Sequence, residues 1–210
     1  MSHVVLLGDS IFDNRAYVAP APDVVRQLRD VLGSGWRATL LAVDGDVTSD
    51  VPSQLRRLPA DATHLVISVG GNDALGSAGL LNQRAASVAE AVDRLAEAQG
   101  RFRSAYARML EAVLARRLPT AVCTVYDANY PEPERRVVVA GLALFNDVIT
   151  RAAFTHGLPL VDLRLICTEP ADYANPIEPS EQGGEKIARV IGALVRHWPE
   201  GPPQSSIWGN

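Results

Sequence analysis

The segment HVVLLGDS, residues 3–10, decides the fold, because an unbroken apolar run leads directly into a tight turn. A strand without alternating polar residues is typical of a sheet that helices cover on both faces. Gly8 allows the chain to turn sharply after the strand. The segment therefore predicts the first strand of a parallel sheet, with Ser10 at its carboxyl edge, where such sheets bind ligands.

Four further apolar runs follow the same pattern, at residues 38–43, 64–69, 120–126 and 158–163. Between them, apolar residues recur with helical spacing. Strands that alternate with helices build a parallel sheet with right-handed crossovers. We therefore predict an α/β fold of three layers, in which helices cover both faces of a five-stranded parallel sheet. Within the helical stretch 82–117, Gly100 is expected to separate two helices.

The length and composition fit one domain. The chain has 210 residues, of which 47% are hydrophobic, enough for one sizeable core. We place this domain at residues 1–198 and interpret residues 199–210 as a polar C-terminal tail, because they are rich in Pro, Gly and Ser. Cys123 and Cys167 have hydrophobic neighbours and are expected to be buried thiols.

The charge pattern argues against several classes of partner. The formal net charge is -4 and no cluster of Lys and Arg is present, which argues against a nucleic-acid-binding protein. The N-terminal apolar run of four residues is too short for a signal peptide or a membrane span. We expect a cytoplasmic protein without a nucleic-acid or membrane partner, and the sequence does not indicate an oligomeric state.

Polar residues gather at the predicted carboxyl edge of the sheet. Ser10 follows the first strand, Gly45 lies in the turn after the second, and Asn72 follows the third. A fixed amide and bare backbone N–H groups are suitable donors to a developing oxyanion. In contrast, three of the four histidines lie just before or at the start of strands, and the fourth ends the last helix (His3, His64, His156 and His197). No histidine is therefore placed to serve this edge.

Four segments together resemble the GDSL/SGNH hydrolases, a family of esterases, lipases, thioesterases and carbohydrate deacetylases. They are GDS (8–10), DGDVTS (44–49), GGND (70–73) and PSEQGGEKIA (179–188), in the order and at about the spacing of that family, over nearly the whole chain. The resemblance implies a flavodoxin-like sheet, a small-molecule ester as substrate, and neither cofactor nor metal.

The resemblance also implies roles for individual residues. Ser10 would be the nucleophile, and an oxyanion hole would consist of the backbone N–H groups of Ser10 and Gly45 with the side chain of Asn72. Asp9, Asp73 and Tyr126 are the candidates for contact with substrate. For the two carboxylates, acceptance of backbone N–H groups in their own turns is the competing interpretation.

The sequence departs from the family in its last block, which normally reads Asp-x-x-His-Pro. Here it is NPIEP, residues 175–179, with Asn175 and Glu178 at the two catalytic positions. A carboxylate with a pKa of about 4.3 is a poor base for a serine, unless burial raises its pKa or the leaving group needs little help. An amide at position 175 could donate an N–H to Glu178, whereas an aspartate would repel it.

We therefore predict a serine-dependent hydrolase of carboxylic esters, thioesters or acetylated small molecules, which acts through an acyl-enzyme. Its catalytic residues would be Ser10, Glu178 and Asn175. A glutamate base is expected to keep activity well below pH 6, where an imidazole would be protonated.

Three alternatives stay open. The protein could bind an acyl or carbohydrate ligand on the same fold without turnover. The residues at 175 and 178 could be introduced substitutions or belong to a differently aligned loop. A metal-assisted phosphoryl transfer could use the edge carboxylates Asp9, Asp13, Asp46 and Asp73. The last is disfavoured because no Gly-rich phosphate loop with a lysine is present.

Overall fold

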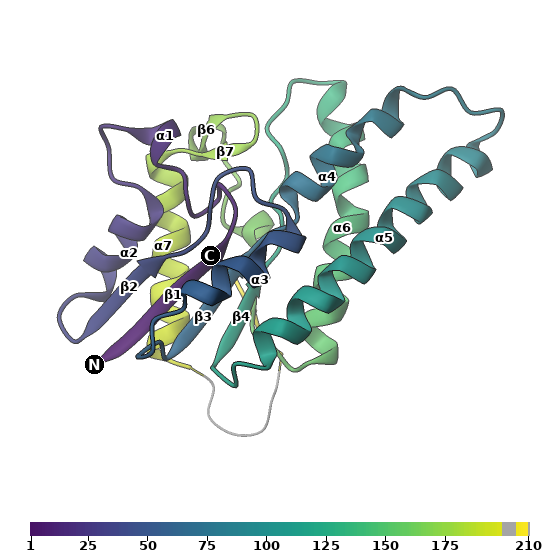
Figure 1. Ribbon diagram of the computed structural model, residues 1–210. Helices are drawn as coiled ribbons and strands as arrows, with labels where there is room; N and C mark the ends of the chain where they lie inside the picture. Colours follow the sequence, from purple (N-terminus) through teal and green to yellow (C-terminus); the bar gives the residue numbers. More distant parts are fainter. Residues whose placement is uncertain (199–204, 210) are drawn as a thin grey trace.

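A computed structural model of the chain describes residues 1–198 and 205–209 and confirms the three-layer α/β fold (Figure 1). All strands of the main sheet are parallel, in the order β2-β1-β3-β4-β5-β8. The strands are β1 (Ser2–Gly8), β2 (Trp36–Leu40), β3 (His64–Ser68), β4 (Thr120–Cys123), β5 (Leu160–Val161) and β8 (Ile207–Trp208).

The sheet has six strands, one more than predicted, because β8 adds to the edge at β5. Its residues belong to the predicted C-terminal tail, of which residues 199–204 and 210 lie outside the described residues. The N–H of Leu160 donates to the carbonyl of Ser206 over 2.8 Å, and the N–H of Asp162 donates to that of Trp208 over 2.8 Å. Without β8, one edge of β5 would expose unpaired backbone N–H and C=O groups. Part of the predicted tail therefore belongs to the sheet.

Helices lie on both faces of the sheet (Figure 1). They are α1 (Arg15–Val18), α2 (Val24–Leu32), α3 (Val51–Gln54), α4 (Gly71–Ser77), α5 (Val88–Leu114), α6 (Glu134–Thr155) and α7 (Glu181–Arg196), with 3₁₀ turns η1 (Thr48–Asp50), η2 (Leu55–Arg57), η3 (Ala78–Asn82), η4 (Leu163–Leu165) and η5 (Pro170–Asp172).

The residues of β1 show how the two faces are filled. Val4 and Leu6 pack in one cluster with α2 and α7, whereas Val5 and Leu7 pack in the other with α5 and α6. Successive side chains of a strand point to opposite faces, so a continuous apolar run is what a doubly covered strand requires. This is the physical basis on which the apolar runs predicted the sheet.

The predicted break at Gly100 is wrong. Helix α5 continues through it for 27 residues, from Val88 to Leu114. A single glycine costs a helix only about 1 kcal/mol, and its many alanine, leucine, glutamate and arginine neighbours favour the helix. Gly100 is not required by packing either, because a Cβ at this position would meet nothing within 4 Å.

Gly8, in contrast, is required by a close approach of two strands. Its φ is +128°, and a Cβ there would lie 1.7 Å from the carbonyl oxygen of Ser68 on β3. The turn that carries Ser10 can therefore begin only at a glycine.

The two glycines generate the first prediction. We expect Gly8→Ala to prevent folding or to destabilise the protein by several kcal/mol, because backbone atoms occupy the site of the new methyl group. The matched variant Gly100→Ala should raise the free energy of unfolding by about 0.5–1 kcal/mol. Urea denaturation monitored by circular dichroism measures both. Equal stability of the two variants would contradict the account of Gly8.

Candidate active site

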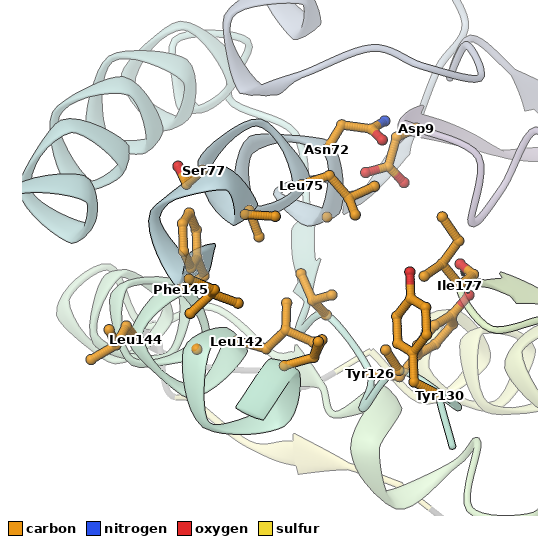
Figure 2. Close-up of a pocket in the computed structure, with 18 of the residues that line it drawn as sticks. Asp9, Asn72, Leu75, Ser77, Tyr126, Tyr130, Leu142, Leu144, Phe145 and Ile177 are labelled. Atoms are coloured by element: carbon orange, nitrogen blue, oxygen red, sulfur yellow. Dashed lines mark hydrogen bonds between the residues drawn. The ribbon is translucent and has the colours of Figure 1, made fainter. Parts of the chain in front are cut away.

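A cavity of about 370 Å³ opens at the carboxyl edge of the sheet (Figure 2). Five residues singled out from the sequence line it: Asp9, Ser10, Asn72, Tyr126 and Glu178. Gly45, Asp73 and Asn175 do not belong to its lining. The chain thus brings the proposed nucleophile and the proposed base to one place from positions 168 residues apart.

Ser10 and Glu178 form the centre of this site. Their exposed fractions are 7% and 5%, and the Ser10 hydroxyl lies close enough to the Glu178 carboxylate to lower its pKa as a hydrogen-bond donor. The oxygen Oε2 of Glu178 has no hydrogen-bond partner within residues 1–198 and 205–209. A buried carboxylate with an unused oxygen is a stronger proton acceptor than one that several donors stabilise.

Burial changes the acid strength of Glu178. Desolvation, assisted by the negative charge of Asp44, raises the pKa of Glu178 to about 7 against the lowering effect of the Ser10 hydrogen bond. The condition set from the sequence, that burial must raise this pKa, is therefore met. The expectation of activity well below pH 6 rested on an ordinary carboxylate pKa and needs correction, since Glu178 becomes protonated as the pH falls through about 7.

The expected hydrogen bond from Asn175 to Glu178 is absent from the described part of the chain. Instead, the side-chain oxygen of Asn175 accepts the N–H of Ile177 over 2.9 Å. Asparagine often bonds the backbone two residues further on and so closes a turn. This turn joins β6 (Tyr173–Asn175) to β7 (Glu178–Pro179), an antiparallel hairpin outside the main sheet. Asn175 therefore shapes the turn that presents Glu178, and its side chain bonds this turn and not the carboxylate.

The three expected oxyanion donors differ in how they are placed. The backbone N–H groups of Ser10 and Gly45 donate to no acceptor among the described residues. The amide of Asn72 donates one hydrogen to the carbonyl of Asp46 over 2.9 Å, which orients the group and leaves its second hydrogen. Gly45 has a φ of +86°, a backbone conformation that glycine adopts without strain.

Gln54, which the sequence analysis did not single out, holds this turn against β1. Its side chain accepts the N–H of Gly8 over 2.9 Å and donates to the carbonyl of Gly8 over 2.7 Å. It also donates to the carboxylate of Asp46 over 2.8 Å. One buried amide thus links the turn that carries Ser10 to the turn that contains Gly45. No local sequence signal indicates this role, because Gln54 lies on a short helix, 46 residues from Gly8.

Asp73 has a structural role rather than the predicted one in substrate contact. One of its oxygens, Oδ2, accepts both the N–H and the hydroxyl of Thr48, over 3.0 and 2.9 Å. Asp13 likewise accepts the N–H of Asp44 over 3.0 Å. These carboxylates stabilise turns at the sheet edge. The competing interpretation expected Asp73 to accept N–H groups of its own turn, whereas its partner Thr48 lies 25 residues away. The described residues contain no group of three or more potential metal ligands.

Asp9 is a second buried carboxyl group in the cavity. It accepts the N–H of Ile11 over 3.2 Å. Burial, and secondarily the charges of Glu178 and Asp73, raise the pKa of Asp9 to about 8. Near neutral pH the Asp9 side chain is therefore largely uncharged, which limits the repulsion that an ionised Glu178 experiences.

Two asparagines and a tyrosine align the segments around the site. Asn14 accepts the N–H of Val24 over 3.0 Å and donates to the carbonyl of Pro179 over 3.3 Å, so it ties the loop after Ser10 to β7. The hydroxyl of Tyr126 donates to the carbonyl of Ile177 over 2.7 Å. Asn146 on α6 is buried and bonds both backbone groups of Val125, which lines the cavity.

The histidines lie away from this site, as predicted. His3 is the second residue of β1 and lies next to Thr39 and Asp61. His64 begins β3, where its ring packs against Trp36 and Trp198. His156 and His197 follow the last residues of α6 and α7. The two cysteines are buried and free, as expected.

Comparison with known proteins identifies what the chain resembles. The model of the GDSL-like Lipase/Acylhydrolase family matches residues 6–186. No curated protein gives a significant match.

Solved structures share the fold at low sequence identity. An extracellular lipase from Streptomyces rimosus has a TM-score of 0.65 and 18% identity, over 92% of this chain and 99% of that one. An aryl esterase from M. smegmatis has a TM-score of 0.67 and 13% identity, and the match covers 95% of this chain and 100% of the esterase. A carbohydrate acetylesterase from Sinorhizobium meliloti has a TM-score of 0.65 and 12% identity, and the match covers 93% of this chain and 99% of the acetylesterase.

The burial of Glu178 generates a prediction about stability. An acid whose pKa is higher in the folded state loses stability as the pH rises from its unfolded value, about 4.5, through about 7. Glu178→Gln lacks this loss. The melting temperature of Glu178→Gln minus that of the unsubstituted protein should therefore increase by a few degrees from pH 5 to pH 8. A constant difference over this range would mean that Glu178 titrates as an exposed carboxyl.

Proposed function

The chain belongs to the GDSL-like Lipase/Acylhydrolase family, and on this premise we propose that it hydrolyses carboxylic esters or thioesters through an acyl-enzyme on Ser10. Glu178 takes the place of the histidine base in this proposal. The observation that carries it is the meeting of Ser10 and Glu178 in one cavity, where the Ser10 hydroxyl is close enough to the carboxylate to lower its pKa as a hydrogen-bond donor. A general base works best when its pKa lies near the working pH, and a pKa of about 7 meets this requirement.

In the acylation step, the hydroxyl oxygen of Ser10 forms a bond to the acyl carbon as its proton passes to Glu178. The negative charge that develops on the carbonyl oxygen is stabilised by the N–H groups of Ser10 and Gly45 and by the Asn72 amide. The bond from the acyl carbon to the leaving oxygen or sulfur then breaks, and protonated Glu178 gives its proton to the leaving group.

Water completes the cycle. Glu178 accepts a proton from the water molecule that attacks the ester on Ser10. The bond between the serine oxygen and the acyl carbon breaks, the serine recovers its proton from Glu178, and a carboxylic acid leaves. No other donor or acceptor of protons is needed in the scheme, and neutral Asp9 does not compete for the proton near pH 7.

A competing function, ligand binding without turnover, is favoured by one observation. The side chain of Asn175 bonds its own turn and donates no hydrogen bond to Glu178, whereas an orienting group normally holds the base of a hydrolytic triad. In this case the cavity would hold an acyl or carbohydrate ligand and Ser10 would not be activated. Reactivity of the serine distinguishes the two functions.

A fluorophosphonate probe tests whether Ser10 is activated. We expect stoichiometric labelling of the protein, none of Ser10→Ala, and labelling of Glu178→Gln that is slower by about 10²-fold or more, since the proton acceptor is lost. Glu181→Gln, a change at an exposed neighbour on α7, is the matched control and should react normally. Absence of labelling in the unsubstituted protein, with the fold intact, would favour the binding function.

The pH dependence of hydrolysis tests the identity of the base. The value of kcat/KM should fall as the pH decreases through about 7, because protonated Glu178 accepts no proton. Asp44→Asn removes a negative charge that raises the pKa of Glu178. In this variant the acid limb, that is, the fall of kcat/KM with decreasing pH, should therefore occur at lower pH. Asp61→Asn, near His3 at the opposite edge, should leave the limb unchanged. An acid limb that stays near 7 in Asp44→Asn would contradict Glu178 as the base.

A further inference from the structure

The cavity extends well beyond the residues that the proposed reaction uses. Figure 2 shows Asp9, Asn72 and Ile177 at one end, and Leu142, Leu144 and Phe145 toward the other. This second part, here called the side arm, lies between α4 with η3 and α6, and reaches Leu95 and Ala98 of α5. An acetyl group on Ser10 would leave the side arm unfilled.

The side arm is lined mainly by apolar side chains, although Asn82 of η3 and Glu134 of α6 also line the cavity. Leu75 and Leu81 contribute from α4 and η3, Leu95 and Ala98 from α5, and Leu142 and Phe145 from α6. Among the described residues that line the cavity there is no lysine, arginine or histidine, so it offers no cation for a phosphate or carboxylate. Ser77, one of its few polar residues, donates its hydroxyl to the carbonyl of Asp73. The lining is thus suited to hydrocarbon and unsuited to a sugar.

Several of these apolar side chains remain exposed. Leu75, Leu81 and Val137 are 44%, 41% and 47% exposed, although all three line the cavity. Helix α6 also has the length and apolar content of a membrane span, a criterion that a helix lining a core or a cavity meets equally well. A ligand in the side arm would cover these side chains, and burial of each methylene group favours binding.

The position of the base indicates which part of an ester enters the side arm. The leaving alcohol receives its proton from Glu178 and must therefore depart on the side of Glu178. Ile177, the neighbour of Glu178, lies at the end of the cavity opposite Leu144 (Figure 2). The side arm therefore lies on the acyl side of the reacting carbon.

On the basis of the proposed function, we propose that the side arm binds the acyl chain of the substrate, and that the preferred substrates are esters of unbranched fatty acids of medium length. The volume sets the length. A cavity of about 150 Å³ holds benzene, which is about 25 Å³ for each carbon. A cavity of about 370 Å³, part of which the reacting groups occupy, therefore accommodates roughly six to ten carbons.

Hydrolysis of p-nitrophenyl acetate, octanoate and hexadecanoate tests this proposal, because the leaving group is constant. We expect kcat/KM for the octanoate to exceed that for the acetate by tenfold or more, and to exceed that for the hexadecanoate. Equal or faster hydrolysis of the acetate would overturn the proposed acyl preference while leaving the proposed function intact. Failure to hydrolyse any ester, together with failure of Ser10 to react with a fluorophosphonate, would overturn the proposed function itself.

Ala98→Phe narrows the side arm and should lower kcat/KM for the octanoate at least tenfold, with the acetate changed less than twofold. Ala96→Phe, on an exposed position of the same helix outside the cavity lining, is the matched control and should behave as the unsubstituted protein. Since Ala98 is buried, Ala78→Phe on an exposed wall of the cavity provides a second variant that tolerates a larger side chain.

Octyl acetate separates the acyl side from the alcohol side. Its long chain is on the alcohol, so Ala98→Phe and Ala78→Phe should leave its hydrolysis unchanged. If these two variants instead lost hydrolysis of octyl acetate and kept that of p-nitrophenyl octanoate, the side arm would bind the alcohol chain and the proposal would be overturned.

Discussion

The close approach of the Ser10 hydroxyl to the Glu178 carboxylate is the interaction on which the site depends. A carboxylate in water is a weak base for a serine, and only its removal from water changes this. The fold provides that removal by placing Glu178 on a small hairpin above the carboxyl edge of the sheet. Asn14 joins the loop after Ser10 to the same hairpin through the carbonyl of Pro179. Burial raises the pKa of Glu178 to about 7, the value that the proposed role as base requires.

A buried carboxylate with an unpaired oxygen destabilises the folded state, so the segments around it must be held firmly. At the start of α7 this support comes from buried Asp172, which accepts the Lys186 ammonium over 2.8 Å and the backbone N–H of Thr168 and Glu169. Gly183 allows the helix to approach Asp172, because a Cβ at Gly183 would lie 2.2 Å from its carbonyl oxygen. These contacts explain the family-like PSEQGGEKIA segment even though the catalytic histidine is absent.

Local sequence patterns predicted the parts of the molecule that depend on local physics. Continuous apolar runs located the strands, and the residues after them located Ser10 and Asn72 at one edge and the histidines at the other. Edge strand β8 and the hairpin that carries Glu178 were not predicted, because each is only two or three residues long and forms through pairing with another segment. The same limitation applies to Gln54 and Asn146, whose side chains bond backbone groups 46 and 21 residues away. For Asn175, reasoning from charge favoured a contact with Glu178, whereas its own turn provided a nearer partner.

The central claim is that the carboxylate at position 178 supplies the base for Ser10, and chemical rescue measures this most directly. In Glu178→Ala, ester hydrolysis is predicted to fall by about 10²–10⁴-fold and to recover in proportion to added formate, a small carboxylate that fits the vacated space. Ser10→Ala should show no recovery. Hydrolysis by Glu178→Ala at the rate of the unsubstituted protein, without formate, would contradict the account.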